Sequence, residues 1–133
     1  MTEPSSPLAP FVAKLEKCAQ LSAADRSAVQ ALPHAVRAFD PGSYLYREGE
    51  RPSHCFIIIS GFAAGQKIVR SGSRQIIDIL LRGDAVDPAN ALIGVANHGV
   101  QVLTRLQAAA VPLQAMSALL SSNPAVARAV WIQ

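Results

Sequence analysis

The sequence contains little that would support several common classes of protein. It has only two cysteines, Cys18 and Cys55, which are too few and too unpatterned for a disulfide framework, a redox pair or a cysteine-ligated cluster. No apolar run approaches the roughly 18 to 20 residues that span a bilayer, and residues 1–20 lack the basic and apolar regions of a secretory signal. We therefore expect a cytoplasmic protein with no membrane partner and two free thiols.

Positive charge is present, but it is scattered along the chain. Twelve basic and nine acidic residues give a formal net charge of +3, and aromatic residues, at 5%, are too rare to be interleaved with a basic run. We therefore do not expect this segment by itself to bind nucleic acid. With 133 residues, 50% of them hydrophobic, the chain fits one domain that can bury a core.

The N-terminal part of the chain carries two helical patterns. Residues 1–7 are polar and contain two prolines, so we expect a disordered leader. Over residues 8–19 the apolar positions recur at the three- and four-residue spacing of one helix face. A second helix is expected to begin after Ser22, whose hydroxyl can accept from the backbone N–H of Asp25, and to stop before Pro33.

After the second helix the period changes to two, and short β-rich runs alternate with glycine-centred turns. So many short strands predict a small all-β barrel or jelly roll rather than alternating strands and helices. The runs 56–59 and 76–81 lack strict alternation, which predicts central strands covered on both faces. The strands are expected near residues 34–39, 43–47, 54–60, 63–70, 74–81, 85–87, 100–106 and 108–113.

From residue 114 the period is helical again, with apolar residues on one face of a short helix. Asn123 and Pro124 then mark the N-cap and the first position of another helix. This last helix reaches Gln133 without a glycine, an asparagine or a basic last turn to end it. We therefore expect the protein to continue beyond residue 133.

Three segments contain glycines at expected turns: the run 39–50, the stretch 56–61, and the pair Gly83-Asp84. Together with the order of helices and strands, they resemble the cyclic-nucleotide-binding domain of the Crp/Fnr family of bacterial transcription regulators over about residues 20–133. The resemblance implies a mainly β double-stranded β-helix, or jelly-roll barrel, with flanking helices over residues 8–133. It also implies a dimerisation helix at the end and a DNA-binding domain beyond it.

In family members that bind cAMP, a cassette corresponding to residues 83–100 holds the nucleotide. A glutamate there binds the ribose hydroxyl, and an arginine pairs with the cyclic phosphate. In this chain Asp87 stands where a glycine is expected, Pro88 replaces the glutamate, and His98-Gly99-Val100 replaces Arg-Ser-Ala or Arg-Thr-Ala. Proline has no carboxylate and neutral histidine has no fixed charge, so we expect no cofactor and no cAMP binding of the usual kind.

A weakened site for an acidic ligand is still possible in this cassette. It would use the N–H groups that begin a short helix expected over residues 89–95. A role in turns and helix capping explains Asp84 and Asp87 at least as well, and an exposed loop position explains His98. The candidate ligand-binding residues are Gly83, Asp84, Asp87, Asn90, His98 and Gly99.

The charges beside the turn Ser71-Gly72-Ser73 have a simpler interpretation. Arg70 and Arg74 flank this turn, and we expect them to be solvated at the tip of a hairpin. Such charges also discourage the pairing of exposed strand edges.

The leading functional hypothesis is a regulatory domain that senses an unidentified small molecule, or only scaffolds a dimer. Its state would pass through the last helix, where Val126, Val130 and Trp131 are candidate homodimer contacts, to a DNA-binding domain. The alternative is a stand-alone cyclic-nucleotide-like module that regulates a partner protein. A cupin-like metal enzyme would have a similar barrel, but the chain has no His-x-His pattern and no catalytic motif, so we expect neither a metal site nor an enzyme.

Overall fold

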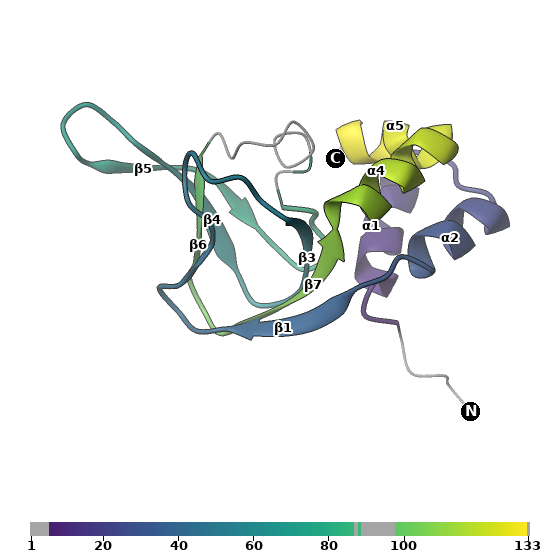
Figure 1. The fold of residues 1–133 in the computed structure, drawn as a ribbon, viewed down its shortest axis with the longest axis horizontal. Coiled ribbons are helices and arrows are strands. Elements are labelled where there is room, and N and C mark those ends of the chain that lie inside the picture. The colour runs from purple at the N-terminus through teal and green to yellow at the C-terminus, as the bar shows by residue number, and fades with distance from the viewer. Residues whose placement is uncertain (1–5, 87, 89–97, 133) are drawn as a thin grey trace.

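The computed structural model describes residues 6–86, 88 and 98–132. Its helices gather at one end of the molecule and its strands at the other (Figure 1). The helices are α1 (Ala9–Cys18), α2 (Ala23–Gln30), α4 (Leu113–Ser122) and α5 (Pro124–Ile132). The strands are β1 (Ala35–Phe39), β2 (Tyr44–Tyr46), β3 (His54–Ser60), β4 (Ala63–Ile68), β5 (Arg74–Leu80), β6 (Gly99–Val102) and β7 (Leu106–Pro112).

These strands form two antiparallel sheets. One has the order β1-β7-β3 and the other the order β2-β6-β4-β5. The expected mainly β jelly roll with flanking helices is therefore confirmed, although the two sheets do not close into a continuous barrel. The strand expected near residues 85–87 is represented by a single bridge between Ala85 and Ile57 on the free edge of β3.

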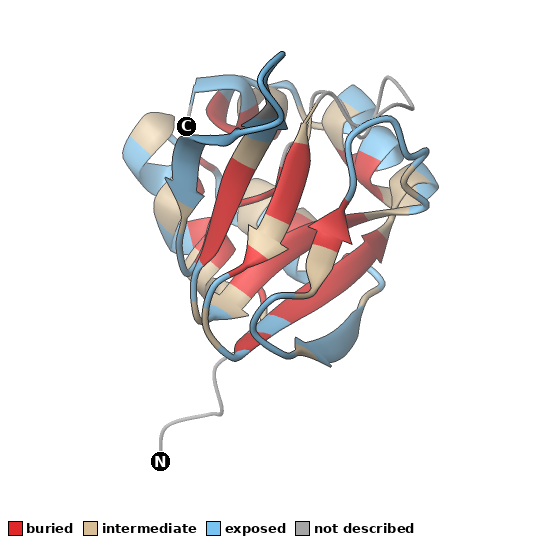
Figure 2. Cartoon of the chain, turned by 90° about the vertical axis from the view of Figure 1, so that its left-hand side faces the viewer, coloured by how far each residue is buried: buried red, intermediate tan, exposed pale blue. Residues whose placement is uncertain are grey.

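Strands β3 and β7 provide the centre of the core and are buried on both faces (Figure 2). Ile57 on β3 and Val111 on β7 pack in a cluster with the helices. Phe56 and Ile58, which point the other way along β3, pack in a second cluster between the two sheets. The prediction that the run 56–59 is covered on both faces is thus confirmed for residues 56–58, although β3 lies at the edge of its sheet and not at its centre.

The same prediction is wrong for the run 76–81. Strand β5 lies at the edge of its sheet, and its side chains Ile76, Ile77 and Ile79 are 57%, 48% and 49% exposed. Figure 1 shows the reason, because the β4–β5 hairpin projects away from the helices, and the described part of the chain does not cover it. A continuous apolar run is therefore compatible with an uncovered edge strand as well as with a central one.

The helix boundaries follow the expected capping residues closely. Ser22 and Asp25 form a reciprocal capping box at the start of α2, in which each side chain accepts from the other's backbone N–H at 3.0 Å. Asn123 lies between the last two helices, and its carbonyl accepts from Ala127 N–H at the start of α5. Its side-chain amide donates to the Leu119 carbonyl of α4, so Asn123 also ends the earlier helix.

The chain begins its described course just before α1. Ser6 Oγ accepts from the backbone N–H of Leu8 at 3.2 Å, and the Ser6 carbonyl accepts from Ala9 N–H at 2.9 Å. The expected leader over residues 1–7 therefore overlaps the turn that leads into α1. None of the described helices is both long enough and apolar enough to cross a membrane.

Candidate functional site

The head of the predicted cassette is a tight turn that the structure fastens to β3. Gly83 has a φ of +89°, which glycine adopts without strain, and its N–H donates to the Ile58 carbonyl at 2.7 Å. Two more backbone hydrogen bonds join this segment to β3: Ile58 N–H donates to the Asp84 carbonyl at 3.0 Å, and Val86 N–H donates to the Phe56 carbonyl at 2.8 Å. The head of the cassette is therefore hydrogen-bonded along the free edge of β3.

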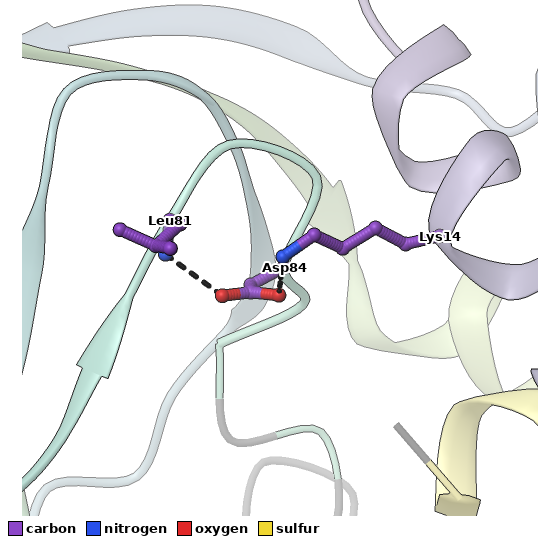
Figure 3. A network of polar contacts seen from close by, with 3 residues as sticks. All are labelled: Lys14, Leu81 and Asp84. Atoms are coloured by element: carbon purple, nitrogen blue, oxygen red, sulfur yellow. Dashed lines mark hydrogen bonds and ion pairs between the residues drawn. The ribbon is translucent and has the colours of Figure 1, made fainter. Parts of the chain in front are cut away.

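Asp84 ties this turn to helix α1 (Figure 3). One of its carboxylate oxygens accepts from the backbone N–H of Leu81 at 2.7 Å, and the other lies 2.6 Å from Lys14 Nζ. The two ionic side chains are 21% and 32% exposed, so the pair is only partly screened by water. Both oxygens of Asp84 thus serve the turn and its attachment to α1.

Gly83 makes the same attachment possible by its small size. A Cβ at this position would lie 2.6 Å from the carbonyl oxygen of Pro10 and 3.0 Å from its carbonyl carbon. No side chain fits there unless the first turns of α1 move. The cassette head and α1 are therefore joined by direct backbone packing as well as by an ion pair.

A second group of polar residues lies on the inner face of the sheet that contains β4. A Cβ built on Gly65 would overlap the carboxylate of Asp78 and would lie 3.2 Å from His98 Nε2. Asp78 on β5 and His98 just before β6 therefore converge over the same glycine. Sequence reasoning selected His98 but missed Asp78, since the pairing of β4 with β5 is what brings the carboxylate to this position.

A cavity of about 280 Å³ lies between β5, the cassette head and helix α5. Two carboxylates, Asp78 and Asp84, contribute to its wall, and Pro88 occupies the wall where the family pattern has its ribose-binding glutamate. Val130 of α5 contributes apolar surface from the opposite side. The complete lining is Asp78, Ile79, Leu80, Asp84, Ala85, Pro88 and Val130.

The other candidate ligand residues are placed less directly. Gly99 is the first residue of β6 and is buried, next to a different cavity on the same sheet. Asp87, Asn90 and the short helix expected over residues 89–95 lie outside the described residues. The structure thus brings Gly83, Asp84 and His98 to the edges of the inner face without assembling the whole predicted set.

The structure divides the three candidate dimer contacts on α5 into two kinds. Val126 and Val130 are 0% and 3% exposed and belong to the core that α5 shares with α1 and α4. Trp131 is 53% exposed and Ile132 is 59% exposed. Of the three candidates, Trp131 is therefore the one whose side chain is available to another molecule, because the two valines stabilise this chain itself.

No cluster of three or more histidine, cysteine, aspartate or glutamate side chains suitable for a metal ion occurs within the described ranges. The histidines there have separate surroundings: His34 Nδ1 lies 2.8 Å from the Leu32 carbonyl, and His54 Nδ1 lies 2.8 Å from Ser53 Oγ. Cys55 is buried in β3, and Cys18 is partly buried.

Two facing antiparallel sheets, a glycine turn at the cassette head and helices that close one end define a ligand-binding jelly roll of the cyclic-nucleotide type. The family model for the cyclic nucleotide-binding domain matches residues 36–123. The chain belongs to this family. No curated protein matches the chain in sequence.

Solved structures of transcription regulators have the same fold. The sensor domain of the regulator DNR from Pseudomonas aeruginosa is 19% identical, with a TM-score of 0.70, over 89% of this chain and 78% of that one. The catabolite activator protein of Thermus thermophilus is 16% identical, with a TM-score of 0.73, over 89% and 55%. The N-terminal domain of a transcriptional regulator from Streptomyces coelicolor A3(2) is 16% identical, with a TM-score of 0.66, over 92% and 81%.

The family model confirms the cyclic-nucleotide-binding-like domain that was expected from the sequence, and these structures of transcription regulators confirm its fold. The chain spans 55% of the Thermus thermophilus protein and 57% of a regulatory protein from Silicibacter pomeroyi DSS-3. It therefore corresponds to one part of these longer relatives.

Proposed function

We propose that this chain is the effector-sensing domain of a Crp/Fnr-type transcription regulator whose cassette does not hold cAMP in the usual way. The observation that carries the proposal is the convergence of Asp78 and His98 over Gly65. By the family pattern, His98 stands where an arginine pairs with the cyclic phosphate. A phosphate at that position would meet the Asp78 carboxylate, and like charges repel most strongly where water is partly excluded.

The chemistry of the cavity favours an effector that is neutral or cationic. Lys14 neutralises Asp84, but no described residue forms an ion pair or a hydrogen bond with the Asp78 side chain. An amine or a hydroxyl group of an effector would give this carboxylate a partner. The alternative acidic ligand would have to rely on backbone N–H groups against an unneutralised carboxylate.

The position of the cavity suggests how the effector would act. It is walled by β5 and the cassette head on one side and by Val130 of α5 on the other. A ligand that contacts both walls would favour one placement of α5 over another, provided that it binds the two states with different affinity. We propose that α5 passes this state to a DNA-binding domain beyond residue 133 and that Trp131, at its exposed end, contributes to a homodimer.

Isothermal titration calorimetry with cAMP and cGMP tests the proposal. We expect no binding at micromolar concentration by the natural chain. The triple variant Pro88→Glu, His98→Arg, Asp78→Ser restores the two missing contacts and removes the repelling carboxylate, so it is expected to gain affinity for cAMP. The matched double variant, which keeps Asp78, is expected to bind cAMP at least about tenfold more weakly than the triple variant.

Two outcomes would refute the proposal. Micromolar binding of either nucleotide by the natural chain would show that the cassette is functional as it stands. Equal gains in the double and triple variants would show that Asp78 does not oppose the phosphate. Circular dichroism of each variant verifies that the substitutions leave the fold intact.

A further inference from the structure

The second sheet carries a larger cavity on its other face. It measures about 410 Å³ and is lined by Tyr44, Arg47, Glu48, Gln66, Arg74 and Gly99. Tyr44 pairs with Gln101 on β6, whose sequence neighbours Val100 and Val102 are buried in the core between the sheets. Successive side chains of a strand point to opposite faces, so this cavity lies on the outside of the sheet, on the face opposite to Asp78.

Two guanidinium groups contact the same aromatic ring beside this outer cavity. Arg47 and Arg74 stack on the ring of Tyr44, with Cζ at 4.3 Å and 5.9 Å from its centroid. Arg74 also donates to Gln101 Oε1 at 3.3 Å, and Gln66 donates to the same oxygen at 2.8 Å. Arg74 is exposed beside the hairpin tip, as expected, but its guanidinium also contacts Tyr44 and Gln101.

Neither guanidinium is neutralised by a carboxylate of the described chain. The ion pairs found there join Lys14 to Asp84 and Arg105 to Asp40. Glu50, which is near Arg47 in sequence, accepts instead from the backbone N–H of Arg47 at 2.5 Å. Two oriented and unpaired guanidinium groups on one cavity form a favourable environment for an anion with several acceptor oxygens.

Glu48 gives the cavity a second kind of chemistry. Its carboxylate repels an anion, but it accepts hydrogen bonds from hydroxyl groups, as does the amide oxygen of Gln66. The outer cavity thus has an anion-binding side, formed by Arg47 and Arg74, and a hydroxyl-binding side. Its volume falls in the range of about 300 to 1,000 Å³ that is usual for small-molecule sites.

We propose that the outer cavity binds a small hydroxylated phosphate monoester, such as a sugar phosphate. Its phosphate would lie between Arg47 and Arg74, and its hydroxyl groups would bond to Glu48 and Gln66. The proposal does not depend on the inner-face site around Asp78, which lies on the opposite face of the second sheet; of the candidate cassette residues, Gly99 lines the outer cavity. A molecule at this site would join β2, the β4–β5 hairpin and β6.

The test is a titration of the full chain, followed by the NMR signals of the arginine Nε–Hε groups, with ribose 5-phosphate, inorganic phosphate and succinate. We expect site-specific shifts at Arg47 and Arg74 and the tightest binding with ribose 5-phosphate. Arg74→Gln is expected to weaken this binding by about tenfold, since a charge-assisted contact is lost. The control Arg70→Gln, on the same hairpin but outside the cavity, is expected to change it by less than about twofold.

Glu48→Gln separates the two sides of the site by the sign of its effect. The substitution removes the repulsion between Glu48 and a bound phosphate, so inorganic phosphate is expected to bind more tightly. Ribose 5-phosphate also loses a strong acceptor for its hydroxyl groups, so its affinity is expected to rise less or to fall. Equal changes for both phosphates would refute the hydroxyl-binding side. Equal effects of Arg70→Gln and Arg74→Gln, or tighter binding of succinate than of either phosphate, would overturn the proposal itself.

Discussion

Replacing Gly83 with alanine tests whether the cassette head is fixed by its contact with α1. The residue has a φ of +89°, and an L side chain in the left-handed region costs roughly 1–2 kcal/mol. The added Cβ would also lie 2.6 Å from the Pro10 carbonyl oxygen. A backbone atom cannot rotate away, so α1 has to shift, at a further cost of roughly 1–3 kcal/mol.

Gly72→Ala is the matched control for this substitution. Its φ is +83°, and nothing lies within 4 Å of the position that a Cβ would occupy. The conformational cost is therefore nearly the same, whereas the cost of displacing α1 is absent. We expect Gly83→Ala to lower the free energy of unfolding by roughly 2–5 kcal/mol and Gly72→Ala by roughly 1–2 kcal/mol.

Urea unfolding followed by far-ultraviolet circular dichroism measures both values. The difference between the two variants is the quantity of interest, since it reports the packing of the turn on α1. A difference below about 0.5 kcal/mol would refute the reasoning, because an error of that size is typical for independent sites. A smaller effect of Gly83→Ala than of Gly72→Ala would refute it outright.

Three further predictions concern the same core. Lys14→Met is expected to lower the free energy of unfolding by about 1 kcal/mol, because the partly buried ion pair with Asp84 is lost. The difference in free energy of unfolding between this variant and the natural chain should decrease in high salt, which screens the ion pair. Ile57→Ala, at a fully buried position of β3, is expected to cost about 2–5 kcal/mol, whereas Ile77→Ala on β5 costs less than about 1 kcal/mol, both measured by urea unfolding. Cys55 should react with a thiol reagent only at the rate of unfolding, and fast labelling of the folded chain would contradict its burial.

Most of the fold could be predicted from the sequence because local chemistry determines it. The capping box of Ser22 and Asp25 sets the start of α2, and positive-φ glycines such as Gly42 and Gly83 set the corners between strands. These signals act over a few residues, so they do not depend on which strands pair. The burial of β5 could not be predicted in this way, since it depends on what covers a strand from elsewhere.

The candidate site was less predictable for the same reason. The motif positions identified His98 and Pro88, but Asp78 enters the inner face only through the register of β5 against β4, in which it stands opposite Gly65. Arg74 and Arg47 are likewise distant in sequence and meet only through Tyr44. Residue spacing within one motif contains no information on such pairings between strands.

The exposed edge of β5 has a consequence for handling the protein. A row of unpaired backbone groups beside exposed isoleucines is a template for the addition of a strand from another molecule. Within β5 only Arg74 and Asp78 carry charge: Arg74 precedes the apolar residues, and Asp78 interrupts them. Charged residues in such places act as gatekeepers against aggregation, so neutralising Asp78 is expected to lower the concentration at which the isolated domain precipitates.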